Sequence, residues 1–257
     1  MDLKHLVSGT DIRGIVSEFE GKKVNLTKNE IEFIGKAFGN WITKKYGRKS
    51  ELENRKIKVS IGYDARHTGP EFSKILRNVL KNMEIDVYDC QMSITPSLFM
   101  TTIFENYKAD GAIMITASHL PSYYNGLKFF TTEGGLEKTD VLEMLEMGNE
   151  KSWQCEANLK EALEIEEKKG RSLTKKLAED YAKYTCEFIR KETGEEKPLK
   201  DFKIVIDAGN GAAGFFADKV IKELGGNPEG SQFLNPDGDF PNHIPNPEAK
   251  EAIESVK

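Results

Sequence analysis

The central part of the chain alternates short apolar runs with longer amphipathic segments, and this alternation constrains the fold more than any other feature. The runs at 57–62, 85–90 and 111–116 are short and contain β-branched residues, which is typical of buried strands. Between them, 70–83 has apolar residues at helical spacing, and 96–106 begins with proline, as helices often do. Strands that alternate with helices predict a parallel sheet with right-handed crossovers, in which reactive groups gather beyond the carboxyl ends of the strands.

Further elements extend this unit at both ends. A capping box at 27–30 predicts a helix over about 28–46. The segment 126–131 predicts a strand that joins the sheet antiparallel, and 139–147 predicts a short helix. We therefore expect an α/β fold in which a mixed, mostly parallel sheet is sandwiched by helices, in a first domain that spans 1–165.

The rest of the chain, 166–257, predicts a second and smaller domain of similar kind. Its expected elements are a long amphipathic helix over 172–192, a strand over 202–206, a helix over 212–224, a short strand over 232–234 and a helix from about 247 onward. A unit this small rarely buries its own faces, so we expect the domain to be incomplete and the chain to be a fragment.

Composition excludes several classes of protein. The 257 residues carry a net charge of −5 without a long run of lysine or arginine, so nucleic acid is not expected as a partner. No apolar stretch approaches the roughly 20 residues that cross a bilayer, and the first residues lack the apolar core of a secretion signal. We expect no membrane partner and a cytoplasmic location. Cys90, Cys155 and Cys186 are scattered and predict neither disulfides nor a zinc site.

A polar loop directly after the third apolar run is the strongest candidate for chemistry. Its sequence is Thr-Ala-Ser-His-Leu-Pro over 116–121, and Asn-Gly-Leu-Lys follows over 125–128. The loop lacks the glycines of a nucleophile elbow, which disfavours an acyl-transfer triad. His119 and Lys128, together with loop amides, would instead offset the charge of a phosphoryl group on Ser118. The pattern therefore favours a serine that carries phosphate.

Two other motifs suggest different chemistry. The segment 209–214 contains G-x-G-x-x-G between an expected strand and an expected helix, as a dinucleotide-binding oxidoreductase requires. No acidic residue stands clearly at the end of the next strand, so tight packing of strand against helix is the favoured interpretation of these glycines. The Asp-Gly-Asp segment at 237–239 resembles a metal loop, but Pro241 and Asn242 break the EF-hand pattern and favour a proline-stiffened connection.

Several charged residues near the start of the chain are expected to form ion pairs. Arg13 lies in a glycine-flanked turn at 9–14, where a surface ion pair is the default. Asp64 and Arg66 follow the first strand, and a structural salt bridge is their default.

Taken together, six segments resemble those of the α-D-phosphohexomutases, the superfamily of phosphoglucomutase and phosphomannomutase. In the family's order they are Gly-Thr-Asp-Ile-Arg-Gly at 9–14, Asp-Ala-Arg at 64–66, the serine loop at 116–121, Asn-Gly-Leu-Lys at 125–128, Asp-Ala-Gly-Asn-Gly at 207–211 and Asp-Gly-Asp-Phe-Pro-Asn-His at 237–243. The resemblance spans the whole chain. It implies phosphohexomutase domain 1 in 1–165 and an incomplete domain 2 in 166–257.

The resemblance also implies a mechanism. The family's serine, here Ser118, gives a phosphoryl group to a hexose 1- or 6-phosphate, forms a bisphosphate, and recovers the other phosphoryl group. Arg13, His119 and Lys128 match positions around that group, and Lys128 is favoured over Arg13 for proton transfer. The resemblance implies a magnesium ion, for which the phosphorylated Ser118 is one ligand, and a hexose 1,6-bisphosphate as activator.

The sequence departs from the family pattern at two places. Leu120 stands where many members have asparagine, and the family's Asp-Gly-Asp-x-Asp-Arg metal loop is absent. The remaining metal ligands are expected beyond residue 257, so the chain alone is expected to be inactive as a mutase. The alternatives are an NAD(P)-dependent oxidoreductase built on 209–214 and a non-catalytic binding protein descended from a mutase.

Overall fold

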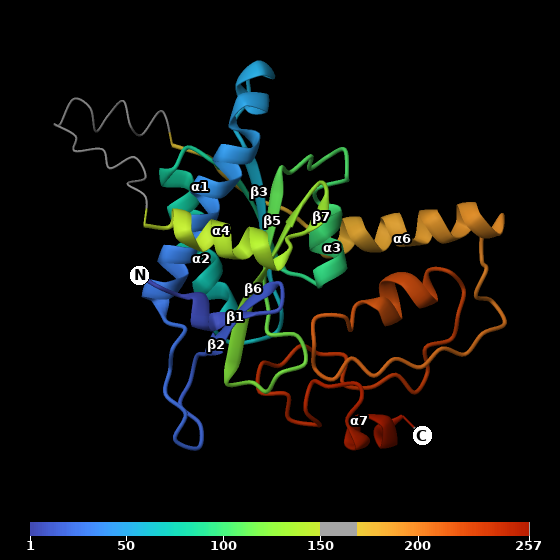
Figure 1. The fold of residues 1–257 in the computed structure, drawn as a ribbon. Helices are drawn as coiled ribbons and strands as arrows, with labels where there is room; N and C mark the ends of the chain where they lie inside the picture. Colours follow the sequence, from blue (N-terminus) through green and yellow to red (C-terminus); the bar gives the residue numbers. More distant parts are fainter. Residues whose placement is uncertain (150–168, 257) are drawn as a thin grey trace.

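Two units follow each other along the chain in the computed structural model, which describes residues 1–149 and 169–256 (Figure 1). The first unit contains an eight-stranded mixed sheet with helices on both faces, as the sequence predicts. The second unit, residues 177–256, is drawn orange to red; it is smaller, begins with one long helix and is otherwise mostly irregular. None of the helices in the described part of the chain has the length and apolarity that a membrane span requires.

The sheet of the first unit is built from β1 (Val7–Ser8), β2 (Asp11–Ile15), β3 (Lys58–Tyr63), β4 (Asp86–Met92), β5 (Gly111–Ile115), β6 (Tyr124–Thr131), β7 (Gly134–Gly135) and β8 (Ser172–Thr174). Their order is β1-β2-β6-β5-β3-β4-β8, and β7 pairs with β6. The strand pairs β5–β3, β3–β4 and β4–β8 are parallel, whereas β6 is antiparallel to β5 and β2. The predictions of three parallel strands and an antiparallel strand after the serine loop are confirmed.

Helices cover both faces of this sheet, as Figure 1 shows. One face lies under α1 (Lys28–Leu52), α2 (Gly69–Asn82) and α4 (Lys138–Met147), and the other lies under α3 (Thr95–Met100) and α6 (Leu177–Thr193). The first face packs Phe38 of α1 on Phe129 of β6, with ring centroids 5.4 Å apart. The second face buries Met114 of β5 in a smaller apolar cluster. Alternate residues of β5 therefore belong to different cores, since successive strand residues point to opposite faces.

Helix α1 begins where the capping box predicts. The Thr27 hydroxyl accepts a hydrogen bond from the Asn29 amide, and the Glu30 carboxylate accepts one from the Thr27 amide at 2.8 Å. These bonds satisfy amides that have no partner within the helix. The helix ends at Leu52, six residues after the expected end at residue 46.

Two expected helices differ from the structure. The helix expected over 96–106 ends at Met100, because the Thr101 and Thr102 hydroxyls and amides bond to carbonyls three residues back and tighten the chain into turns. The helix expected over 172–192 begins only at Leu177. Its first residues form β8 instead, since Val87 and Lys175 amides bond across the exposed edge of β4.

The second unit has less regular structure than the sequence predicts. In place of the strands expected at 202–206 and 232–234, the structure has isolated parallel bridges from Lys203 to Asn227 and from Asp207 to Gln232. The helix expected over 212–224 is a π-helix, η2 (Ala217–Lys222), and the last helix is α7 (Lys250–Ser255). Glycines at 209, 211 and 214 disfavour a longer helix at this point. The expected division at residue 165 lies outside the described residues and stays a prediction.

Candidate functional site

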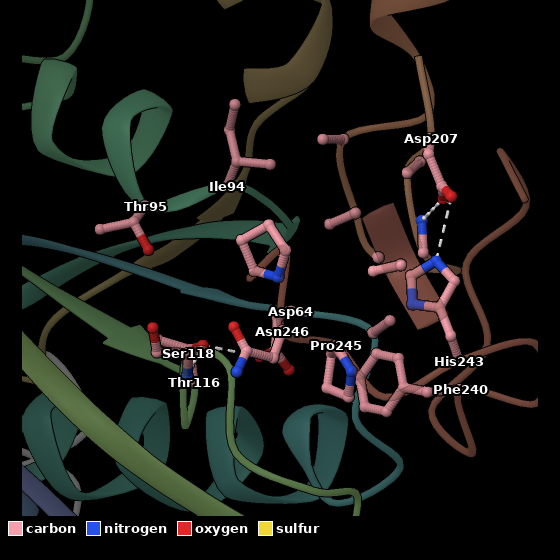
Figure 2. A pocket seen from close by; sticks show the side chains of 18 of the residues that line it. Asp64, Ile94, Thr95, Thr116, Ser118, Asp207, Phe240, His243, Pro245 and Asn246 are labelled. Carbon is pink, nitrogen blue, oxygen red and sulfur yellow. Dashed lines mark hydrogen bonds and ion pairs between the residues drawn. The ribbon is translucent and has the colours of Figure 1, made fainter. Parts of the chain in front are cut away.

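A cavity of about 500 Å³ lies at the carboxyl ends of β3, β4 and β5. The loops after these strands contribute Asp64, Ile94 and Ser118 to its wall, and the second unit contributes Asp207 and His243 from the other side (Figure 2). Carboxyl ends of parallel strands are where α/β proteins place their ligands. The serine loop thus lies at the expected edge of the sheet and borders a cavity between the two units.

Ser118 has a constrained backbone and an exposed side chain. Its φ angle is 58°, in the left-handed region that residues other than glycine rarely adopt. The Thr116 hydroxyl accepts a hydrogen bond from the Ser118 amide at 2.9 Å and donates one to Asp64 at 2.6 Å. The Ser118 hydroxyl lies 3.4 Å from Nδ1 of His119, which is long for a hydrogen bond. The loop therefore presents this hydroxyl to the cavity with little restraint from its neighbour.

The conformation of the serine loop depends on Arg66, which is only 1% exposed. Its guanidinium donates hydrogen bonds to the carbonyls of Ser118 (3.1 Å), Leu120 (2.6 Å), Pro121 (2.7 Å) and Tyr124 (2.9 Å). Its Nε atom donates to the Asp64 carboxylate at 3.2 Å. All five N–H groups of the side chain are thus used. The default expectation of an Asp64–Arg66 salt bridge is confirmed, and the contacts to the loop were not predicted.

Asp64 is a structural carboxylate. Burial raises its pKa, and the charge of Arg66 and the hydroxyl of Thr116 partly offset this effect. One carboxylate oxygen accepts from the Arg66 amide, and the other accepts from Arg66 Nε and Thr116. Because both oxygens already have donors, Asp64 is poorly placed to bind a metal ion.

Arg13 and Lys128 meet at a buried carboxylate. Oδ2 of Asp11 lies 2.8 Å from Nη2 of Arg13 and 2.6 Å from Nζ of Lys128. Lys128 lies opposite Met114 in the β5–β6 pair, so the two side chains share a face of the sheet. Met114 also lines the cavity. The two cations therefore stand on the same face of the sheet as Met114, but neither of them, nor His119, is among the residues that line the cavity. Nε of Arg13 is buried without a partner in the described part of the chain.

On the opposite wall, Asp207 accepts several hydrogen bonds. Its donors are Ser255 Oγ at 2.6 Å, the Gly209 amide at 2.8 Å, Gln232 Nε2 at 3.0 Å and His243 Nε2 at 3.1 Å. Burial alone would raise the pKa of Asp207, but these bonds, that from Ser255 foremost, hold it below its ordinary value. Sequence reasoning did not identify this cluster, since its members are spread over 207–255.

His243 is held between two acceptors. Its Nδ1 atom lies 2.8 Å from the Ile244 carbonyl, and its Nε2 atom lies 3.1 Å from the Asp207 carboxylate. Burial alone would lower the pKa of His243, but these two contacts raise it above its ordinary value. An imidazole that faces an acceptor at each nitrogen is best satisfied when both carry protons, which favours a charged His243 beside a charged Asp207.

A separate cluster of potential metal ligands lies at the surface. One ligand atom each of His67, Asp237 and Asp239 lie within 4.8 Å of one another. The Asp-Gly-Asp segment was expected to be a stiffened connection, and the structure adds His67 Nε2 at 2.9 Å from Asp239. A histidine with two carboxylates is not the all-oxygen ligand set that magnesium prefers. Within the described residues that line the cavity, Asp64 and Asp207 already have hydrogen-bond donors, so these residues do not complete a magnesium site around Ser118.

The glycines at 209–214 are explained by close packing. A Cβ atom on Gly214 would lie 1.8 Å from the Leu234 carbonyl oxygen, and one on Gly209 would lie 3.0 Å from the His243 ring. Gly209 also has a φ angle of 51°. This geometry favours the packing interpretation over a dinucleotide site.

Both units match models of the same protein family. Residues 4–152 match the family model described as phosphoglucomutase/phosphomannomutase, alpha/beta/alpha domain I, and residues 179–257 match domain II of the same family. The chain is 30% identical over 246 residues to phosphoglucomutase of Neisseria meningitidis serogroup B, covering 96% of this chain and 46% of that protein. It is 33% identical over 174 residues to phosphoglucosamine mutase of Alkaliphilus oremlandii, covering 67% of this chain and 36% of that protein.

Solved structures agree with the fold. A phosphoglucomutase/phosphomannomutase family protein of Burkholderia thailandensis aligns with all of this chain and 50% of its own length, with a TM-score of 0.73 at 24% identity. A putative phosphomannomutase from Thermus thermophilus aligns with 96% of this chain, with a TM-score of 0.69 at 22% identity. The chain spans about half the length of the curated phosphoglucomutase it matches.

Proposed function

Because the chain belongs to the phosphoglucomutase/phosphomannomutase family, we propose that it forms the phosphoserine-bearing part of a phosphohexomutase. The complete enzyme would interconvert hexose 1-phosphate and hexose 6-phosphate through a phosphoserine and a bisphosphosugar intermediate. The observation that supports this most directly is the position of Ser118. Its hydroxyl faces a cavity at the carboxyl edge of the sheet, on a loop fixed by a buried arginine.

In this proposal Ser118 carries the phosphoryl group that is transferred. A sugar hydroxyl attacks the phosphorus atom and loses its proton, while the bond from phosphorus to the Ser118 oxygen breaks and that oxygen takes up a proton. In the return transfer the Ser118 hydroxyl attacks the other phosphoryl group of the bisphosphate and loses its proton, while the bond from that phosphorus to the sugar oxygen breaks and the sugar oxygen takes up a proton. Lys128 is the favoured group for exchanging the sugar proton, because an amine can release a proton more readily than a guanidinium. Arg13 and His119 would offset charge on the transferring oxygens.

Asp11 explains how two cations coexist on this face of the sheet. Arg13 and Lys128 share one oxygen of this carboxylate, which is only 4% exposed. Two positive charges with one negative charge leave a net positive site, which attracts a phosphorylated ligand. The buried Nε of Arg13 adds a donor that an anion could satisfy.

Magnesium, a hexose 1,6-bisphosphate activator and a cytoplasmic location belong to the same proposal. Magnesium would neutralise charge on the phosphoryl group, and Ser118 would supply one oxygen. The described residues do not by themselves complete its ligand set, so the remaining ligands are proposed to come from outside them.

Peptide mass spectrometry tests the role of Ser118. The full-length protein that contains this chain, purified from its own cells, is expected to carry a phosphoryl group on Ser118. Ser122 lies on the same loop and is also exposed, so it is a matched control. Ser118→Ala should abolish both the phosphopeptide and mutase turnover, whereas Ser122→Ala should retain them. A phosphoryl group on another residue would remove Ser118 from this role, and an unphosphorylated, inactive protein would favour the non-catalytic alternative.

A further inference from the structure

The turn at 237–240 in the second unit is packed directly on the first unit. A Cβ atom on Gly238 would lie 2.7 Å from the Ala65 carbonyl oxygen and 2.8 Å from the His67 amide nitrogen, so a residue with a side chain would not fit without a shift. Beside it, Asp239 lies 2.9 Å from Nε2 of His67. The turn thus contacts the segment that follows β3 and contains Arg66.

The next residue, Phe240, packs its ring against the guanidinium of Arg66. The guanidinium carbon lies 5.2 Å from the centroid of the Phe240 ring, which is cation–π geometry. Phe240 has a φ angle of 50°. A bulky residue keeps this backbone conformation only where its surroundings hold it. The ring also lines the cavity, where Figure 2 shows it beside Pro245.

Arg66 connects this contact to the serine loop. Its N–H groups donate to four carbonyls between Ser118 and Tyr124, and its guanidinium carbon lies over the Phe240 ring. A guanidinium that is held by these hydrogen bonds and also packed on an aromatic ring has little freedom to rotate. The second unit therefore contacts a buried side chain that holds the serine loop through four hydrogen bonds.

We propose that Phe240 is a positioning residue for Ser118, which acts through Arg66 to keep the serine loop in its left-handed conformation. The second unit then does more than form one wall of the cavity. The packing of its 237–240 turn on the first unit limits the opening of the loop that contains Ser118. The proposal rests on the proposed function only for the role of Ser118.

Hydrogen exchange measured by mass spectrometry on the full 257-residue chain tests this linkage. Phe240→Leu keeps an apolar side chain but removes the aromatic face. The loop amides of Leu120 and Tyr124 bond to carbonyls within the loop and report its opening. Exchange of peptides that cover 117–124 is expected to rise on the order of tenfold in this variant, while exchange in α2 stays unchanged.

Two further variants make the result specific. Phe240→Tyr keeps the ring over Arg66 and is expected to exchange like the wild type. Phe202→Leu makes the same chemical change at a residue of the second unit that is 59% exposed, and it is expected to leave 117–124 unchanged. The proposal is overturned if Phe240→Leu does not alter exchange at 117–124, if it raises exchange in α2 equally, or if Phe240→Tyr behaves like Phe240→Leu. A normal linkage in a protein never phosphorylated on Ser118 would reject the proposed function alone.

Discussion

At the scale of single residues, the serine loop shows what the sequence can and cannot predict. The residue types at Ser118, His119 and Lys128 were recognisable because they are consecutive or nearly so in the chain. The carbonyl contacts of Arg66 were not, because a loop's carbonyl directions depend on tertiary structure. For the same reason the sequence predicted an ion pair for Arg13 but did not identify Asp11 as a partner shared with Lys128.

The Asp207–His243 pair is expected to stabilise the second unit within a limited pH window. The pKa of His243 is raised above 6.5, so its contribution is complete below pH 6.5 and is lost as the pH rises through the folded-state pKa. The pKa of Asp207 is lowered below 3.8, so its contribution is complete above pH 3.8 and is lost as the pH falls through the folded-state pKa. The pair therefore contributes fully between these two ordinary values.

Urea denaturation at a series of pH values checks this expectation. Wild-type stability should decline as the pH is raised from 6.5, and His243→Gln should lose this part of the decline because glutamine does not titrate. His5→Gln is the matched control, since His5 is exposed in the first unit, within the short helix η1 (Lys4–Leu6). An unchanged slope in His243→Gln would show that the pair does not couple protonation to folding.

At the scale of elements, the predicted and observed strands and helices agree best where the local sequence pattern is strongest. The strands β3, β4 and β5 have clear apolar runs and form within two residues of their expected bounds. Helix α1 begins where its capping box predicts but continues six residues beyond its expected end. At 172–174 the sequence predicts a helix where the structure has strand β8. Pairing with the edge of β4 leaves no signal in the local sequence, because the partner is distant along the chain. The strand expected at 202–206 makes only isolated bridges, since its hydrogen-bond partners near Asn227 and Gln232 are themselves irregular.

The packing of Gly214 provides a prediction for the turn that precedes η2. Gly214→Ala places a methyl group 1.8 Å from the Leu234 carbonyl oxygen, so the second unit should lose about 3 kcal/mol of unfolding free energy from overpacking. Gly47→Ala in α1 is the control, because its methyl group would meet only Thr43 at 3.6 Å and should stabilise the helix by about 1 kcal/mol. Chemical denaturation of both variants measures the difference.

The same variant separates two interpretations of the glycine motif. If Gly214→Ala is tolerated and the wild type binds a nicotinamide cofactor in a fluorescence titration, the oxidoreductase alternative gains support. A destabilised variant without cofactor binding agrees with close packing.

At the scale of the whole molecule, the two units enclose the cavity together. The sequence predicted the two units and the edge of the sheet where the serine lies. It did not predict the contact between Phe240 and Arg66, since residues 174 positions apart meet only through the arrangement of the units.

The 257-residue chain by itself is expected to show no mutase turnover. It spans 46% of the Neisseria phosphoglucomutase, and the acidic residues in its described cavity wall already have hydrogen-bond donors, so a catalytic metal would lack ligands. The assay contains glucose 1-phosphate, magnesium and glucose 1,6-bisphosphate, with a complete phosphoglucomutase as the positive control. Appreciable turnover by this chain would contradict the expectation.

The pairing of β8 with β4 has a practical consequence for dividing the protein. β8 lies after residue 168, yet it completes the sheet of the first unit. A protein cut at residue 165 would lose it and expose the backbone of β4 along an unprotected strand edge. Such edges recruit other chains and promote aggregation. A soluble version of the first unit should therefore extend at least through Lys175, whose amide bonds to Asp89 at the end of this pairing.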